Sequence, residues 1–422
     1  MPSATLARPG RRPWRRLRRH AAVAAALLAF LGTACANAAG PSATATEKKE
    51  IFNTAAPHAL LLDADSGAVL FEKNADQPVP PSSLAKLMTV ELVFRGLADG
   101  TLSPDREFIV SEYAWRHGGA PSRTSSMFAP LHSSVAVKDL IRAVIVQSAN
   151  DACITLAEGI AGSEEKWAER MNARAGELGL THSHFANATG LPDPSMAVSV
   201  RDLGRLALHL IHTYPQYYGI FNEREMTWNN IRQFNRNPLL NMGIGADGLK
   251  TGFTSGGGYG LVGSAVQNNW RLIVVVNGLK TDKERAEESK RLLEWGFKSF
   301  EARLLFAEGQ FIGEAKVFGG ETSSVPLMAK GPVSIMVQRN AGERILARVV
   351  YTGPVPAPIQ RGQQIARLRI FRGDTLALET PLQAADDVAR GSMTWRALDT
   401  VGELAVNLIR KGTSKLAERA EK

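Results

Sequence analysis

Apolar residues recur along most of the chain at the spacings of both helices and strands. Helices are expected over 83–96, 137–146, 152–160 and 282–300. Before the last of these, two apolar runs at 259–266 and 271–276 flank the turn Gln267-Asn268-Asn269, which predicts a β-hairpin. This alternation of helix and strand patterns predicts an α/β domain over residues 57–303.

The pattern changes after residue 303. Short alternating segments separated by Gly and Pro turns predict strands over 311–318, 333–338, 345–351, 364–371 and 376–380. Since no helical pattern interrupts them, we expect a small all-β domain over 304–390.

The final segment, 391–422, has the pattern of an amphipathic helix. Its apolar stripe would contain Trp395, Leu398, Val401, Leu404, Ala405, Leu408 and Ile409. Arg410, Lys411 and Lys415 cluster near its end. A Trp-bearing helix with a basic end is typical of an interfacial membrane anchor. A helix docked on the β domain or in an oligomer would show the same stripe.

The first 38 residues have the three parts of a secretory signal peptide. Seven arginines precede the short apolar run Ala21–Leu31, and Ala36-Asn37-Ala38 forms an A-x-A cleavage site. The apolar run is short for a membrane span. Residues 39–56 are mostly small and polar, which predicts a flexible lead-in to the first domain.

Removal of this segment changes the charge and the cysteine content. The net charge of +9 would fall by seven, to +2, so the basic composition does not indicate a nucleic-acid partner. Cys35 would be lost, and Gly32 stands where a lipoprotein signal has Leu. The remaining Cys153 has no partner for an internal disulfide and is expected to pack as a small apolar residue.

Ser83 and Lys86 form the first of three motifs that could carry chemistry. Positions three apart share one face of a helix, so the hydroxyl and the amine can touch. Burial and positive neighbours would lower the pKa of Lys86 and let it accept the serine proton. The alternative is an ordinary helix that follows Pro80-Pro81, capped by Ser82, with a solvated lysine.

Ser148-Ala149-Asn150 is the second motif, and it separates two predicted helices. Ser148 could relay a proton between Lys86, Ser83 and a leaving group, while Asn150 could hold the lysine and donate to a substrate amide. Serine and asparagine also suit a helix start, so capping is the alternative.

Lys250-Thr251-Gly252 is the third motif, at the start of the predicted hairpin. Lys250 could bind a substrate carboxylate by charge and Thr251 by a hydrogen bond. Gly252 would allow a substrate backbone to approach closely. The alternative is a lysine on an edge strand without a ligand.

Two further patterns are interpreted as structural. The run 258–263 matches G-x-G-x-x-G, but a strand and a turn surround it where a dinucleotide site needs a helix start. His182 and His184 form an H-x-H pair with no third ligand nearby in the sequence. We therefore expect no cofactor and no metal.

With these motifs in order, the chain resembles the D-alanyl-D-alanine carboxypeptidases, the low-molecular-mass penicillin-binding proteins. The S-D-N signature shared by class A β-lactamases and penicillin-binding proteins has Asp where this chain has Ala149. The resemblance extends to 58–70, 147–153, 177–180, 188–191, 236–240 and 247–252. It implies a penicillin-binding/β-lactamase-like transpeptidase domain, with an antiparallel sheet and helices, followed by a small β domain and a C-terminal helix.

The resemblance also implies a role for each motif residue. Ser83 would form the acyl-enzyme, Lys86 would be the base, Ser148 the proton relay and Lys250 the carboxylate ligand. The backbone N–H groups of Ser83 and Phe253 would form the oxyanion hole. Many relatives have His where this chain has Phe253, so only the backbone role is carried over. Catalytic roles are thus expected for Ser83, Lys86 and Ser148, and substrate contacts for Asn150, Lys250, Thr251, Gly252 and Phe253.

The expected reaction is removal of the terminal D-alanine from a peptidoglycan pentapeptide, with β-lactams as inhibitors. A class A β-lactamase would need Glu-x-x-Leu-Asn between the second and third motifs, and the chain has none there. A DD-endopeptidase would share the motifs, and a non-catalytic penicillin-binding scaffold would not need them. The signal and the C-terminal helix together predict an exported enzyme, peripheral on the periplasmic face of the cytoplasmic membrane.

Overall fold

The protein is described from a computed structural model, which covers residues 52–392 apart from 340–341, 343 and 374. The predicted signal peptide, most of the predicted lead-in and the predicted C-terminal helix lie outside the described residues. Within the described residues, no helix combines the length and the apolarity needed to cross a bilayer.

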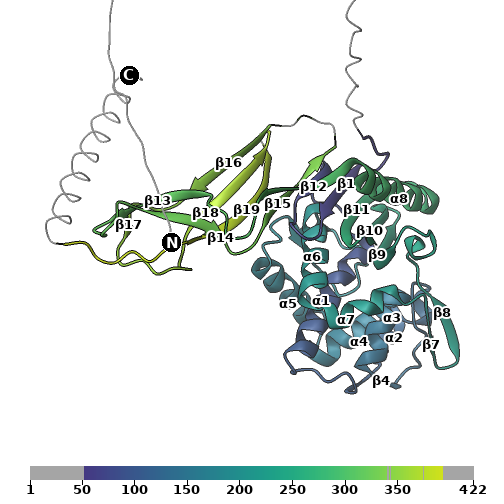
Figure 1. Ribbon diagram of the computed structural model, residues 1–422. Coiled ribbons are helices and arrows are strands. Elements are labelled where there is room, and N and C mark those ends of the chain that lie inside the picture. The colour runs from purple at the N-terminus through teal and green to yellow at the C-terminus, as the bar shows by residue number, and fades with distance from the viewer. Residues whose placement is uncertain (1–51, 340–341, 343, 374, 393–422) are drawn as a thin grey trace, which may run out of the picture. The chain divides into compact units, whose positions relative to one another are not determined.

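A five-stranded antiparallel sheet is the centre of the first domain (Figure 1). Its strands, in spatial order, are β2 (Val69–Lys73), β1 (His58–Asp63), β11 (Trp270–Leu279), β10 (Gly258–Gln267) and β9 (Ala246–Thr254). Apolar residues on both faces of β11 are buried, since Ile273 and Val275 pack on one side while Val274 and Val276 pack on the other. The sheet is therefore covered by other elements on both faces.

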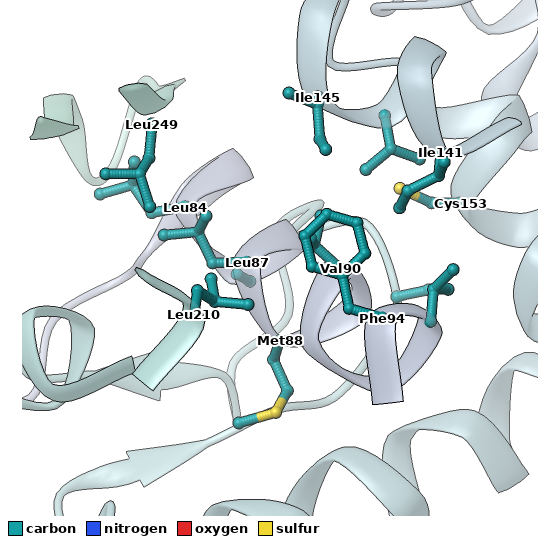
Figure 2. Close-up of a cluster of buried hydrophobic side chains, with 14 of the residues drawn as sticks. Leu84, Leu87, Met88, Val90, Phe94, Ile141, Ile145, Cys153, Leu210 and Leu249 are labelled. Carbon is teal, nitrogen blue, oxygen red and sulfur yellow. The ribbon is translucent and has the colours of Figure 1, made fainter. Parts of the chain in front are cut away.

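The helices of the first domain are α1 (Lys86–Ala98), α2 (Glu112–Gly118), α3 (Val137–Val146), α4 (Asn150–Ala161), α5 (Glu164–Glu177), α6 (Val200–Thr213), α7 (Pro215–Tyr218) and α8 (Asp282–Ser299). Two of them cover the sheet directly. Helix α8 packs on β10 and β11, and α6 packs on β1 and β11. Figure 2 shows Leu87, Val90 and Phe94 of α1 among buried side chains from several other elements, including Cys153. Cys153 thus packs as a small apolar residue, as predicted.

Shorter elements connect these. They are the 3₁₀ turns η1 (Ser82–Ala85), η2 (Ala120–Ser122), η3 (Gly219–Asn222) and η4 (Pro238–Asn241), and the paired strands β3 (Glu107–Ile109) with β4 (Ser134–Ala136), β5 (Ser183–His184) with β6 (Ala197–Val198), and β7 (Glu225–Trp228) with β8 (Ile231–Phe234). The predicted helix over 137–146 is confirmed as α3, and the predicted hairpin as β10 and β11. The glycine-rich run 258–263 lies within β10, as expected.

The second domain is formed by β strands. Its six-stranded sheet has the order β16 (Ile345–Val350), β18 (Gln364–Arg372), β19 (Thr375–Ala384), β14 (Ser324–Ala329), β13 (Gly313–Phe318) and β17 (Val355–Pro356). A separate pair joins β12 (Phe300–Phe306) to β15 (Val333–Gln338). The sequence pattern missed β12, β14 and β17, and the expected domain boundary after residue 303 falls inside β12.

Candidate active site

Ser83 lies on the 3₁₀ turn η1, and Lys86 is the first residue of α1. The Lys86 amine contacts the Ser83 hydroxyl at 3.1 Å, so the predicted pair is present. The alternative, a helix capped by Ser82, is wrong, because Pro81 is the N-cap residue of η1, Ala85 is that of α1, and Ser82 has a φ of 54°. The Ser82 hydroxyl instead contacts the Thr254 hydroxyl at 2.9 Å, which ties η1 to the end of β9.

Three oxygen atoms surround the Lys86 amine. Besides the Ser83 hydroxyl, the Asn150 side-chain oxygen lies at 2.6 Å and the Thr189 carbonyl at 2.5 Å. Lys86 is fully buried, and this burial lowers its pKa to about 8. Loss of solvent disfavours the charged amine, and the nearby Arg236 guanidinium lowers the pKa further. A lysine with this pKa is partly neutral near neutral pH and can accept a proton.

The second motif positions Asn150 against the lysine. Ala149 is the N-cap residue of α4 and no side chain caps this end, so capping does not explain the motif. The Asn150 amide nitrogen donates to the Thr124 hydroxyl at 2.9 Å, so its oxygen faces Lys86. Ser148 is buried with a φ of 65°. Within the described residues no hydrogen bond joins Ser148 to Lys86 or Ser83.

The third motif lies on β9, the strand at the edge of the sheet. Lys250 is 2 % exposed, and its amine donates to the Thr251 carbonyl at 3.1 Å. Burial and the nearby Lys86 amine lower the pKa of Lys250 well below its usual value. A substrate carboxylate beside Lys250 would restore the charged form, because an opposite charge stabilises it.

Three other predicted site residues lie on this strand: Thr251 and Gly252 are buried, and Phe253 is exposed. From the sequence, Gly252 was predicted to let a substrate backbone approach β9 closely. The structure shows a second reason why position 252 requires glycine. A Cβ there would lie 3.1 Å from both Leu84 and the Pro81 carbonyl, where β9 packs on η1. Phe253 is 52 % exposed and stacks on Tyr259, with ring centroids 4.2 Å apart.

These elements border a hollow of about 370 Å³. It is lined by Ser83, Arg123, Thr124, Ser125, Asn150, Gly190, Leu191, Arg236, Phe253 and Thr254. Arg236 was not predicted to be a site residue, although 236–240 carried part of the resemblance. Volume alone would not have identified this hollow as the candidate active site. A larger hollow, of about 660 Å³, lies beside Asp63 and Trp270, and no motif residue lines it.

Glu164, at the start of α5, is a second residue that the sequence did not reveal. Its carboxylate accepts the Ala188 N–H at 3.1 Å and the Tyr113 hydroxyl at 3.2 Å. Ala188 precedes the Thr189 carbonyl that contacts Lys86. Glu164 thereby fixes the segment that supplies one of the three oxygens, and its negative charge raises the pKa of Lys86.

Gly190 allows this segment to approach the nucleophile. It has a φ of 78°, and a Cβ there would lie 1.9 Å from the Ser82 carbonyl. Any other residue at 190 would push the segment away from η1 and Lys86.

The described residues contain no group of three or more His, Cys, Asp or Glu side chains that could hold a metal. His182 and His184 are both exposed.

Segments of the chain match two known families. Residues 42–281 match the D-alanyl-D-alanine carboxypeptidase family, and residues 300–390 match the C-terminal domain of penicillin-binding protein 5. The D-alanyl-D-alanine carboxypeptidase DacC of Escherichia coli is 39 % identical over 345 residues, which cover 81 % of this chain and 86 % of the relative.

Solved structures of similar proteins agree with this match. Penicillin-binding protein 5 from Haemophilus influenzae has a TM-score of 0.71 and 37 % identity, over 80 % of this chain and 98 % of the other. Penicillin-binding protein 6B from Escherichia coli has a TM-score of 0.62 and 33 % identity, over 78 % and 95 %. The predicted fold is confirmed in both of its domains.

Proposed function

Because the chain belongs to the D-alanyl-D-alanine carboxypeptidase family, we propose that it removes the terminal D-alanine from peptidoglycan stem peptides through an acyl-enzyme on Ser83. The contact of 3.1 Å between the Ser83 hydroxyl and the buried Lys86 amine is the observation that carries this proposal. A serine hydroxyl is a weak nucleophile at its ordinary pKa and needs an adjacent base.

Acylation starts with attack of the Ser83 oxygen on the carbonyl of the penultimate D-alanine. The serine proton moves to the neutral Lys86 amine as the new C–O bond forms. Negative charge then develops on the former carbonyl oxygen. The N–H groups of Ser83 and Phe253 are the proposed donors to this oxyanion.

Collapse of the intermediate breaks the amide bond. The leaving amine takes a proton from the Lys86 ammonium, with Ser148 as the proposed relay, and free D-alanine departs. Water then attacks the Ser83 ester, and Lys86 accepts the proton of that water. Return of this proton to the Ser83 oxygen regenerates the enzyme and releases the shortened peptide.

The substrate carboxylate is assigned to Lys250 and Thr251 on β9 and to Arg236, whose charge is close enough to Lys250 to lower the pKa of that lysine. Arg236 lines the hollow, and no ion pair to it occurs in the described part of the chain. It is therefore available to share a carboxylate with Lys250. β-Lactams carry a carboxylate beside their reactive amide, and we propose that they acylate Ser83 in the same orientation.

Release of D-alanine from a pentapeptide tests the activity. The purified enzyme should release it, and the Ser83→Ala variant should not. Mass spectrometry after benzylpenicillin treatment should place the adduct on a peptide that contains Ser83. An adduct that persists in Ser83→Ala would reject the assignment of the nucleophile.

We further propose that the enzyme is exported and binds the periplasmic face of the cytoplasmic membrane through residues 391–422. The support is the apolar stripe from Trp395 to Ile409 with its basic end. Full-length mature protein should float with anionic liposomes, and less so at high salt. A chain that ends at Gly391 should bind penicillin but not liposomes. Equal partitioning of the two forms would show that the helix is not an anchor.

A further inference from the structure

A second hollow, of about 380 Å³, adjoins the one that contains Ser83. It is lined by Pro80, Pro81, Ser82, Gly190, Leu191, Pro192, Asp193, Pro194, Met196, Thr254, Ser255 and Gly256. Gly190, Leu191 and Thr254 line both hollows. A molecule held at Ser83 can therefore extend into the second hollow.

The order of residues along β9 gives the direction of this extension. Lys250 precedes the proposed oxyanion donor Phe253, while Thr254 and the two residues after it follow. Because β9 is an edge strand, an extended peptide can lie along its free side. With the terminal carboxylate at Lys250, the acyl part of the substrate runs past Phe253 toward Thr254.

The second hollow is apolar with an acidic rim. Met196 is 4 % exposed and Leu191 is half-buried, while four prolines form rigid walls. Asp193 is exposed on the segment between the two loop prolines. One oxygen of its carboxylate accepts the Ser195 N–H at 2.8 Å and the Ser195 hydroxyl at 2.6 Å. No described residue donates to the other oxygen, so a ligand cation can reach it.

Asp193 remains negatively charged in this position. The hydrogen bonds from Ser195 lower its pKa, and the nearby His184 acts in the same direction. No ion pair involves Asp193 within the described residues. The rim is therefore a carboxylate beside an apolar floor, which suits a flexible aliphatic chain that ends in an ammonium group.

We propose that this second hollow is the subsite for the stem-peptide residue that precedes the two D-alanines, and that it takes an aliphatic side chain whose terminal ammonium pairs with Asp193. The proposal rests on the function proposed above, because that function sets the direction of the substrate. The position fits this residue, since the penultimate D-alanine occupies the reaction centre and its amino side leads toward Thr254.

Acetylated tripeptides X-D-Ala-D-Ala, in which X is lysine, norleucine or alanine, test the subsite. Norleucine keeps the methylenes of lysine without the charge. We expect kcat/KM to fall about two- to fivefold from lysine to norleucine, as for an exposed ion pair. A further fall of about tenfold is expected from norleucine to alanine, because several methylenes lose their burial.

Asp193→Asn should remove the preference for lysine over norleucine and leave the norleucine peptide unaffected. Glu165→Gln is the matched control, since Glu165 is an exposed carboxylate that does not line this hollow. The preference of the wild type should also weaken at high salt. Equal kcat/KM for all three peptides, or an equal loss on all three in Asp193→Asn, would overturn the proposal.

Competition with acylation by a fluorescent penicillin separates this proposal from the proposed function. The three peptides should compete in the order lysine, norleucine, alanine, whether or not D-alanine is released. Competition in this order without release would reject the carboxypeptidase activity and keep the subsite. Release of D-alanine with no order among the peptides would reject the subsite alone.

Discussion

The two domains differ in whether they bury polar and charged side chains. In the described chain, every polar or charged residue that is buried lies between Thr54 and Ser289. The six-stranded sheet of the second domain has an apolar core, with residues such as Val325, Leu327 and Ile370. Its Glu379 pairs with Arg367 and Arg369 on the surface. Among the described residues, only those of the first domain bear the cost of removing charges from water.

Within the first domain, a buried charged side chain with a structural role differs from one with a proposed catalytic role in the groups that it contacts. Glu91 is fully buried, but it accepts hydrogen bonds from Arg174, Tyr214 and His209. Lys86 and Lys250 have only uncharged oxygen partners in the described residues, and burial lowers the pKa of both. A buried amine without a carboxylate is costly to stability, and it provides a base and an anion site.

Loss of the Lys86 amine should have the largest effect on activity. Lys86→Met nearly preserves the volume and removes the base, so acylation by penicillin should slow by about 10²- to 10⁴-fold. In the wild type, the rate should rise with pH through about 8, because the neutral amine accepts the proton. Stopped-flow acylation measures both.

Lys138→Met is the control for this change, since Lys138 is an exposed lysine paired with Asp105. Its acylation rate should equal that of the wild type. A near-normal rate in Lys86→Met would mean that another group accepts the serine proton.

Loss of the Lys250 charge should have a smaller and selective effect. Lys250→Gln should lower kcat/KM for peptides with a free carboxylate by about 10- to 100-fold, the range for a charge-assisted hydrogen bond. Thioesters without the carboxylate should lose less, because they never formed the ion pair. Lys280→Gln, at an exposed lysine, is the control. Equal losses on both substrate classes would assign Lys250 to the chemical steps.

Glu164 should affect the protonation of Lys86. Glu164→Gln keeps an oxygen for the Ala188 N–H and removes a charge that raises the pKa of Lys86. The rise of the acylation rate with pH should therefore move to lower pH. Glu164→Ala should also lose about tenfold in rate, because the Ala188 N–H and the Tyr113 hydroxyl lose their acceptor. An unshifted pH profile in Glu164→Gln would reject this role, and Glu165→Gln should not shift it.

The spacing of apolar residues correctly predicted the helices and strands in which that spacing is regular. Helix α3 and the hairpin of β10 and β11 have apolar residues at regular spacing. Strand β14 was missed because Pro326 interrupts its pattern, although this proline pairs with Glu314 in the sheet. Strand β12 was missed because it follows α8 directly, at the predicted end of the first domain.

The site was predictable where motif side chains make the contacts. The pairing of Lys86 with Ser83 and with Asn150 follows from the order of the motifs. The Thr189 carbonyl could not be predicted, because a backbone oxygen 103 residues away has no side-chain signature. Glu164 reaches the site through one backbone N–H, so it was missed for the same reason.

The smallest effects are expected in the second domain. Glu379→Gln breaks two ion pairs, yet both arginines are about half exposed, so the free energy of unfolding should change by less than about 1 kcal/mol. Ile370→Ala, in the fully buried core of the same sheet, should cost about 2–5 kcal/mol. Neither change should alter acylation of Ser83, because the active-site residues lie between 83 and 254. Thermal unfolding and penicillin acylation of both variants measure these effects. A loss of acylation in Glu379→Gln would show that charge in the second domain acts on the catalytic site, and the contrast between the two domains would then fail.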